Sequence, residues 1–252
     1  MRTDASLIRQ KFEEAFAAVR DGDYSSAHRI LLELANQGFA GAQFNLGLMY
    51  LNGRGRPRDE GEAAKWFRKA ADQGYAAAQH GLGGMYDTGR GMPRNDVEAV
   101  RWFRKAADQG LAKAQSDLGV MYAKGRGVAQ NVAEAAKWFR KAADQVYLAA
   151  QVNLGVMYEI GQGVPKDLAE AAKWYQSAAD QGDARAQVNL GVMYATGRGL
   201  PKDTVRACVW FNLSAAQGNL NAERSRELVL RSMTPAQIAE AHKLANEWKP
   251  KQ

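Results

Sequence analysis

A 36-residue period runs through most of the chain. Several residues recur in the same order in five consecutive copies, and every step between copies is 36 residues. An Ala-Gln pair begins its series at Ala42-Gln43, and a Met-Tyr pair begins at Met49-Tyr50. A fixed period of this length indicates a solenoid, because each unit buries its apolar face only against its neighbours. The recurring tryptophans are Trp66, Trp102, Trp138, Trp174 and Trp210.

Each copy predicts two helices. In the first copy, apolar residues recur at helical spacing from Ala42 to Tyr50, and Gly53 marks the end of that helix. The second helix covers roughly residues 59–72, and Gly74 follows it at a position that tolerates positive φ. The apolar stripe of this second helix consists of Ala63, Trp66, Phe67, Ala70 and Ala71.

Two positions predict unusual local structure. Gly47 lies inside the first helix, where glycine costs about 1 kcal/mol relative to alanine, and a glycine recurs there in all five copies. We expect it to admit close approach of the small Ala63-Ala64 and Ala70-Ala71 faces of the partner helix. Val146 replaces the glycine, such as Gly110, that closes the other second helices. The turn at Val146 must therefore avoid positive φ or accept strain.

The repeated pattern resembles a known family. The string AQFNLGLMYLNGRG, followed by EAAKWFRKAADQG, is similar to the Sel-one-like repeat, a relative of the tetratricopeptide repeat. The resemblance covers residues 39–218 in five full copies. It implies antiparallel helix pairs stacked into a right-handed superhelix whose first helices line a concave face. It also implies a scaffold or adaptor role, as in most members, which are often bacterial and often exported.

Atypical sequence flanks the five copies. Residues 1–38 predict an N-terminal capping helix pair with a turn at Gly22-Asp23-Tyr24, and residues 219–252 predict C-terminal capping helices. Thr234–Gln237 fits a capping box with proline at the first helical position. Together with residues 39–218, these caps predict an all-α, right-handed α-solenoid of about fourteen antiparallel paired helices, forming one repeat domain.

Enzyme chemistry has little support in the sequence. The three histidines are widely separated and have no repeated carboxylate partner, and metal-ligand spacing is absent. The one cysteine, Cys208, replaces a repeat alanine, which suggests a small buried residue. No serine is followed three residues later by lysine, so the nucleophile pattern of penicillin-recognising enzymes is missing. We therefore expect no enzyme activity and no cofactor.

Composition limits the classes of partner. A formal net charge of +7 favours acidic partners but does not specify nucleic acid. The tryptophans lie on the apolar stripe, so we expect them in the core rather than stacked on bases. No apolar run approaches the roughly 20 residues that span a membrane. We expect a monomer, cytoplasmic as written, or periplasmic or secreted if a removed signal peptide precedes Met1.

Two basic elements also repeat. A Gly-Arg-Gly turn, first at Gly53-Arg54-Gly55, has the composition of a phosphate-binding loop, but no strand precedes it and the spacing matches no nucleotide fingerprint. We interpret it as a helix-ending glycine plus a turn. Arg68-Lys69 lies in the last turn of a second helix, where cations complement the helix dipole and Asp72 is placed to pair with Arg68. A functional basic stripe over the first three copies stays open.

Recognition is expected where the copies differ. A solenoid keeps its core positions constant, and several first-helix positions vary from copy to copy. By resemblance to tetratricopeptide repeats, these positions face the concave groove. The candidate peptide-binding residues are Phe44, Asn45, Leu48, His80, Ser116, Asp117, Lys124, Asn153, Glu159 and Asn189.

Two features of this face are specific. Asn45, Asn153 and Asn189 share one repeat position, and their amides could clamp the backbone of an extended peptide or bond locally to neighbouring helices. Both alternatives stay open. His80 with the nearby pair Gly81 and Gly84 predicts a locally thinned groove that admits a bulky side chain of a partner.

The sequence favours a non-enzymatic scaffold or adaptor that binds another protein or peptide through its concave face. The alternative is a cell-envelope factor that binds peptidoglycan or another glycan, or that acts as the regulatory subunit of an enzyme. Binding of nucleic acid by a related helical repeat is not favoured, because valines dominate positions where a base code needs polar variation.

Overall fold

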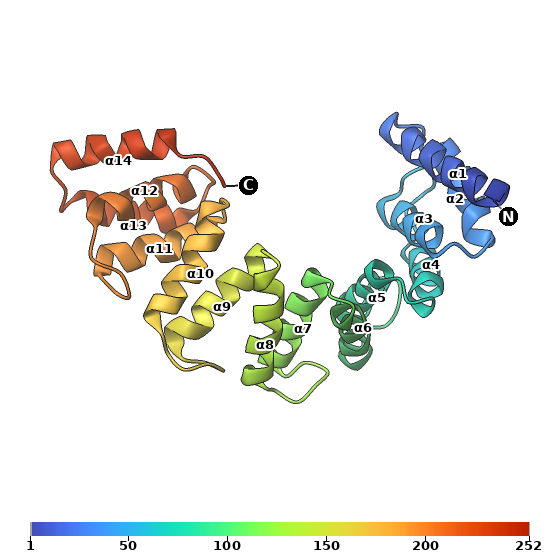
Figure 1. The fold of residues 1–252 in the computed structure, drawn as a ribbon, viewed down its shortest axis with the longest axis horizontal. Coiled ribbons are helices and arrows are strands. Elements are labelled where there is room, and N and C mark those ends of the chain that lie inside the picture. The colour runs from blue at the N-terminus through green and yellow to red at the C-terminus, as the bar shows by residue number, and fades with distance from the viewer. Residues whose placement is uncertain (1, 252) are drawn as a thin grey trace. The chain divides into compact units, whose positions relative to one another are not determined.

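The computed structural model describes residues 2–251, with side chains from residue 5 onward. All regular secondary structure in this range is helical, and its fourteen helices confirm the predicted all-α solenoid (Figure 1). The chain divides into two compact units, residues 1–130 (unit 1) and 131–252 (unit 2). This division cuts through the repeated copies, so the boundaries predicted for the caps stay predictions.

Unit 1 contains seven of the helices, and consecutive helices pack against one another. They are α1 (Arg2–Arg20), α2 (Tyr24–Asn36), α3 (Ala40–Asn52), α4 (Glu60–Asp72), α5 (Ala76–Thr88), α6 (Asp96–Asp108) and α7 (Ala112–Lys124).

Unit 2 contains the other seven. Its last helix, α14, begins with the predicted capping box, in which the side chains of Thr234 and Gln237 each bond the backbone of the other residue. Its helices are α8 (Val132–Asp144), α9 (Leu148–Ile160), α10 (Leu168–Asp180), α11 (Ala184–Thr196), α12 (Thr204–Ala215), α13 (Leu220–Leu230) and α14 (Pro235–Glu247).

An aromatic ring requires the glycine inside the first helices α3, α5, α9 and α11. A Cβ built on Gly47 would lie 2.6 Å from Cδ1 of Phe67, which is far inside van der Waals contact. Gly83 would meet Phe103 at 2.7 Å, and Gly155 would meet Tyr175 at 2.6 Å. The partner helix does approach closely, as expected, with the Ala63 carbonyl oxygen 3.3 Å from the Cβ position of Gly47, but the aromatic ring of that helix comes nearer than its alanines.

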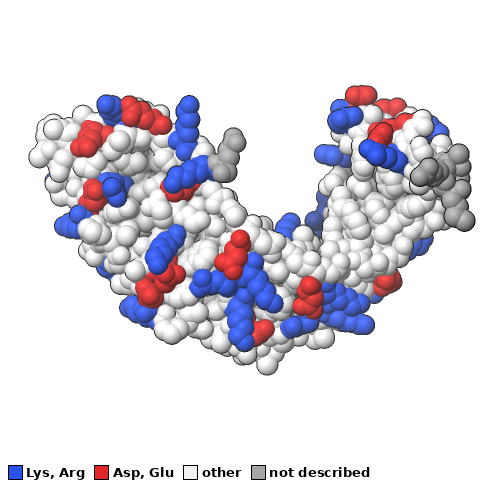
Figure 2. Space-filling view, viewed as in Figure 1, with Lys and Arg blue, Asp and Glu red and all other residues white. Residues whose placement is uncertain are grey.

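The Gly-Arg-Gly elements form turns after the first helices, as predicted. They also contact the preceding copy. A Cβ on the second glycine, Gly91, would lie 2.2 Å from the carbonyl oxygen of Glu60 in the preceding copy. Arg90 reaches the Glu60 carboxylate at 2.9 Å, and Arg126 reaches Asp96 at 2.8 Å. Lys and Arg lie beside Asp and Glu on the face drawn in Figure 2. The arginines of these two turns are therefore paired within the protein.

Arg68 and its equivalent Arg140 contact aromatic rings of the next copy. Arg68 donates to the hydroxyl of Tyr86, and its guanidinium lies 5.4 Å from the centre of the Trp102 ring. The same contact joins Arg140 to Tyr158 and Trp174. The expected pairing of Arg68 with Asp72 is absent from the described residues. Arg68 is half-buried and joins two copies, so it does not belong to a solvated basic stripe.

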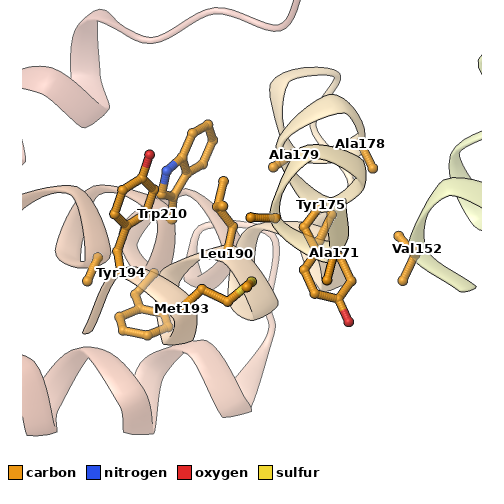
Figure 3. Close-up of a cluster of buried hydrophobic side chains, with 13 residues drawn as sticks. Val152, Ala171, Tyr175, Ala178, Ala179, Leu190, Met193, Tyr194 and Trp210 are labelled. Atoms are coloured by element: carbon orange, nitrogen blue, oxygen red, sulfur yellow. The ribbon is translucent and has the colours of Figure 1, made fainter. Parts of the chain in front are cut away.

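The core of unit 2 is built from large apolar side chains of successive helices (Figure 3). Leu190 of α11 lies between Tyr175 of α10 and Trp210 of α12. The Trp248 ring packs edge-on against Trp210, with 6.3 Å between their centres, and Cys208 is fully buried as predicted. Four of the five repeat tryptophans are buried, which confirms their place in the core, and the fifth is half-buried.

Val146 accepts strain. Its φ is +64°, and its N–H bonds the carbonyl of Ala143 at 2.9 Å. The next N–H, of Tyr147, bonds Ala142 at 3.1 Å. Gly110 makes the equivalent bond to Ala107 at 2.9 Å, so the turn keeps its geometry despite the side chain. Val146 therefore occupies a left-handed conformation that costs a residue with a Cβ about 1–2 kcal/mol.

Candidate functional site

An open groove lies on unit 1 at the predicted site of thinning. It has a volume of about 410 Å³ and is formed mainly by the first helices α3 and α5. We call it the glycine groove. Its lining residues are Phe44, Leu48, Leu51, Phe67, Ala77, His80, Gly81, Gly84, Met85, Thr88, Arg90 and Lys113.

The groove exists because two side chains are missing. Gly84 stands where the other copies carry leucine or valine, and a Cβ built on it would meet nothing within 4 Å. Gly81 stands at the asparagine position, and its Cβ would lie 3.4 Å from the Phe67 ring. The ring of Phe67 therefore lies under a gap one helical turn long.

Stacked aromatic rings form one wall of the groove. The Phe44 ring lies 5.5 Å from the Phe67 ring at an interplanar angle of 29°. It also lies 5.3 Å from the ring of Tyr75, which is 38% exposed. Such ring pairs hold each other in offset arrangements. The wall is thus apolar and fixed in orientation, which suits it to receive a flat or bulky apolar group.

The rim of the groove is basic. His80 Nε2 lies 2.7 Å from Asp117 Oδ2, so this ring nitrogen already has a partner on α7. The Thr88 hydroxyl donates to the Gly84 carbonyl at 2.8 Å. Arg90 is paired with Glu60, whereas Lys113 is exposed and has no ion pair among the described residues. None of the lining residues is acidic.

The first-helix face of unit 2 differs at the equivalent positions. Val156 and Val192 stand where α5 has Gly84, and Val156 is 37% exposed. In α10, Tyr175 stands at the position where the other copies carry a phenylalanine such as Phe67. Its hydroxyl donates to Glu159 Oε2 at 2.9 Å. Arg198 lies 3.4 Å from the other oxygen of Glu159.

The Tyr175 hydroxyl is held in its neutral form. Burial raises the pKa of Tyr175 well above its usual value of 10.0, and the negative charge of Glu159 raises it further. The Asn189 side chain acts on the same hydroxyl and opposes this rise in pKa. Glu159 and Asn189 are thus engaged in a network inside unit 2.

The structure brings three of the predicted site residues together in the glycine groove: Phe44, Leu48 and His80. Asp117 joins them through its contact with His80. Lys124 is exposed at the end of α7 and does not line this groove, and Ser116 is buried. The role of each in peptide binding stays a prediction.

The asparagine position favours local bonding in two of three copies. Asn45 donates to the Gly41 carbonyl at 2.7 Å within its own helix. Asn189 interacts with Tyr175. Asn153 is half-buried, and its side chain makes no hydrogen bond to the described part of the chain. Of the two alternatives, a peptide clamp made from all three amides has the weaker support.

The sequence does not predict that Arg90 and Lys113 line the groove. Phe67 lies in the core as predicted, with 1% of its surface exposed, although it borders the groove. Lys113 belongs to the first turn of α7, one copy beyond the two glycines, so only the packing of α5 against the next copy reveals it. The glycines themselves were the signal that located the gap.

Among the described residues, no group of three His, Cys, Asp or Glu side chains is arranged to hold a metal ion. None of the helices in that range combines the length and the apolar character needed to cross a bilayer.

Comparison with known proteins places the fold. The model of the Sel1 repeat matches residues 40–75, 76–111, 112–147, 148–183 and 184–219. A Sel1 repeat protein from Oxalobacter formigenes is 33% identical, with a TM-score of 0.81 over 94% of this chain and 99% of that one. No curated protein matches the chain significantly.

A second solved structure is similar but longer. It is a protective antigen of uropathogenic Escherichia coli with an SLR fold, 34% identical, with a TM-score of 0.83 over 96% of this chain. The chain spans 56% of that antigen's length. An immunity protein from Pseudomonas aeruginosa, 21% identical with a TM-score of 0.53, shares the fold alone. With five matched repeats over most of its length, the chain belongs to the Sel1 repeat family, whose solenoids are typically protein-interaction scaffolds.

Proposed function

We propose that this protein is a non-enzymatic scaffold that binds a segment of another protein, or a peptide, in the glycine groove of unit 1. The observation that carries the proposal is the side-chain gap at Gly81 and Gly84. Ligand sites are concave, mostly apolar and bordered by a few polar groups, and this groove has all three properties.

The position of the gap supports a binding role over a packing defect. Gly84 lowers the helix propensity of α5 by up to about 1 kcal/mol relative to alanine. No neighbouring atom requires a glycine there, in contrast to Gly83 next to it. A residue that weakens its helix without relieving a clash is explained by the space that it leaves open.

A glycan ligand fits the groove less well. Sugars need many hydrogen-bonding groups, and those at this rim are already engaged: His80 with Asp117, Thr88 with the backbone, and Arg90 with Glu60. Among the described charged residues that line the groove, Lys113 has no ion pair. We therefore favour a peptide, whose side chains can fill an apolar gap.

The test is a selection of peptides from a random display library on the immobilised full chain, followed by affinity measurement by fluorescence anisotropy. The decisive variant is Gly84→Leu, because the first copy carries Leu48 at this position and the helix tolerates it. We expect a loss of affinity of at least tenfold, which is about 1.4 kcal/mol.

The matched control is Val192→Leu, which enlarges the same repeat position in unit 2. It should leave the affinity unchanged. Failure to select any peptide, or equal binding by wild type and Gly84→Leu, would overturn the proposed function.

A further inference from the structure

We infer that the segment bound by the glycine groove is an acidic peptide that inserts one large apolar side chain over Phe67 and places a carboxylate at Lys113. This inference rests on the proposed function and names its ligand class. It follows from the size of the gap, the chemistry of its wall and the charges on its rim.

The gap limits the number of inserted side chains. Gly81 and Gly84 are three residues apart and lie on the same face of α5. The side chains of Phe44 and Leu48 border the gap from α3. The exposed surface between them is one helical turn long, so it accommodates a single bulky group rather than a row of side chains.

The wall selects an aromatic or long aliphatic group. The inserted side chain would meet mainly the half-buried Phe44 ring, which stacks on the buried Phe67 ring, and Met85 is buried beside the same groove. Aromatic rings and methionine both favour contacts with other aromatic side chains. Phe, Trp, Leu and Met are therefore the expected anchors.

The basic residues on the groove rim favour a peptide that carries an acidic residue beside the inserted side chain. The groove is lined by Arg90, Lys113 and His80 and by no carboxylate. The two acidic residues that reach its rim are already paired, Glu60 with Arg90 and Asp117 with His80. Lys113 is exposed and has no ion pair within the described chain, so it is the cation with capacity for a ligand carboxylate.

The experiment uses the same full-length chain and display library. We expect selected peptides to carry one large apolar residue with an Asp or Glu close to it in sequence. Replacing that acid by lysine should weaken binding to wild type at least tenfold. The charge reversal Lys113→Glu should weaken binding of the acidic peptide and restore binding of its lysine version.

A matched reversal controls for net charge. Lys243→Glu changes the net charge by the same amount on α14, outside the groove, and it should leave both peptides unaffected. Peptides that require the open Gly84 but are neutral or basic, or are indifferent to Lys113→Glu, would overturn this inference while the proposed function stands. An absence of any selected peptide would overturn the proposed function itself.

Discussion

The two units use the same repeat to build different surfaces. In unit 1, glycine replaces the repeated valine on α5 and leaves a gap above the buried ring of Phe67. In unit 2, Val156 and Val192 keep that position filled, and Tyr175 carries a hydroxyl tied to Glu159. The backbone pattern is the same in both. A few departures from the repeat therefore decide where a surface is open and where it is closed.

The largest effects on stability are expected from substitutions at two neighbouring glycines of unit 1, Gly83 and Gly84. Gly83→Ala forces a methyl group to within 2.7 Å of Phe103, so we expect a destabilisation of about 1–3 kcal/mol from overpacking. Gly84→Ala points its methyl group into open space and should stabilise by up to about 1 kcal/mol. Urea unfolding of both variants measures the difference, and effects of the same sign would contradict the assignment of the gap.

The next largest effect on stability is expected from a substitution in the turn after α8. Val146→Gly should stabilise the protein by about 1–2 kcal/mol, because glycine adopts φ of +64° without the strain that valine accepts. The matched variant is Gly110→Val in unit 1, which should destabilise by a similar amount. Thermal unfolding of the pair is the measurement. If Val146→Gly is less stable than wild type, the contacts of the valine side chain contribute more free energy than its positive φ costs.

Removing the hydroxyl of Tyr175 is expected to have a smaller effect on stability. Tyr175→Phe restores the residue found at the equivalent position in unit 1, and it removes the hydrogen bond to Glu159. We expect a loss of about 1 kcal/mol at neutral pH. Phe211→Tyr is not expected to gain that amount, because Ala195 stands where α9 has Glu159.

The same variant has an expected pH dependence. The folded protein raises the pKa of Tyr175, so the stability that comes from keeping this hydroxyl neutral is complete below pH 10.0. It is lost as the pH rises above 10.0, because the unfolded chain ionises and the folded one does not. The free energy of unfolding of wild type should therefore decline more steeply above that pH than that of Tyr175→Phe. Parallel curves would contradict the burial of an un-ionised hydroxyl.

Much of the fold follows from the sequence because the repeat is regular. The period places the helices, Thr234 places the last cap, and the substitution of glycine by Val146 locates a strained turn. These are local consequences of residues a few positions apart. Comparing copies also located the gap, since Gly84 departs from the position that Val120 shares with its counterparts.

What the sequence could not give depends on contacts between copies. Arg68 meets Tyr86 across 18 residues, and the helical spacing instead suggested Asp72, four residues away. Lys113 reaches the groove only because α7 packs beside α5. Ser116 is buried although its neighbour Asp117 is half-exposed. The direction of each side chain depends on how closely neighbouring helices approach, and periodicity does not report that distance.

A crystal structure of the full chain with a selected peptide tests the central claim most directly. The account predicts one large apolar side chain of the peptide in contact with the Phe67 ring, above Gly81 and Gly84, with an acidic group beside Lys113. A peptide bound instead along the valines of α9 and α11, with the glycine groove empty, would contradict it.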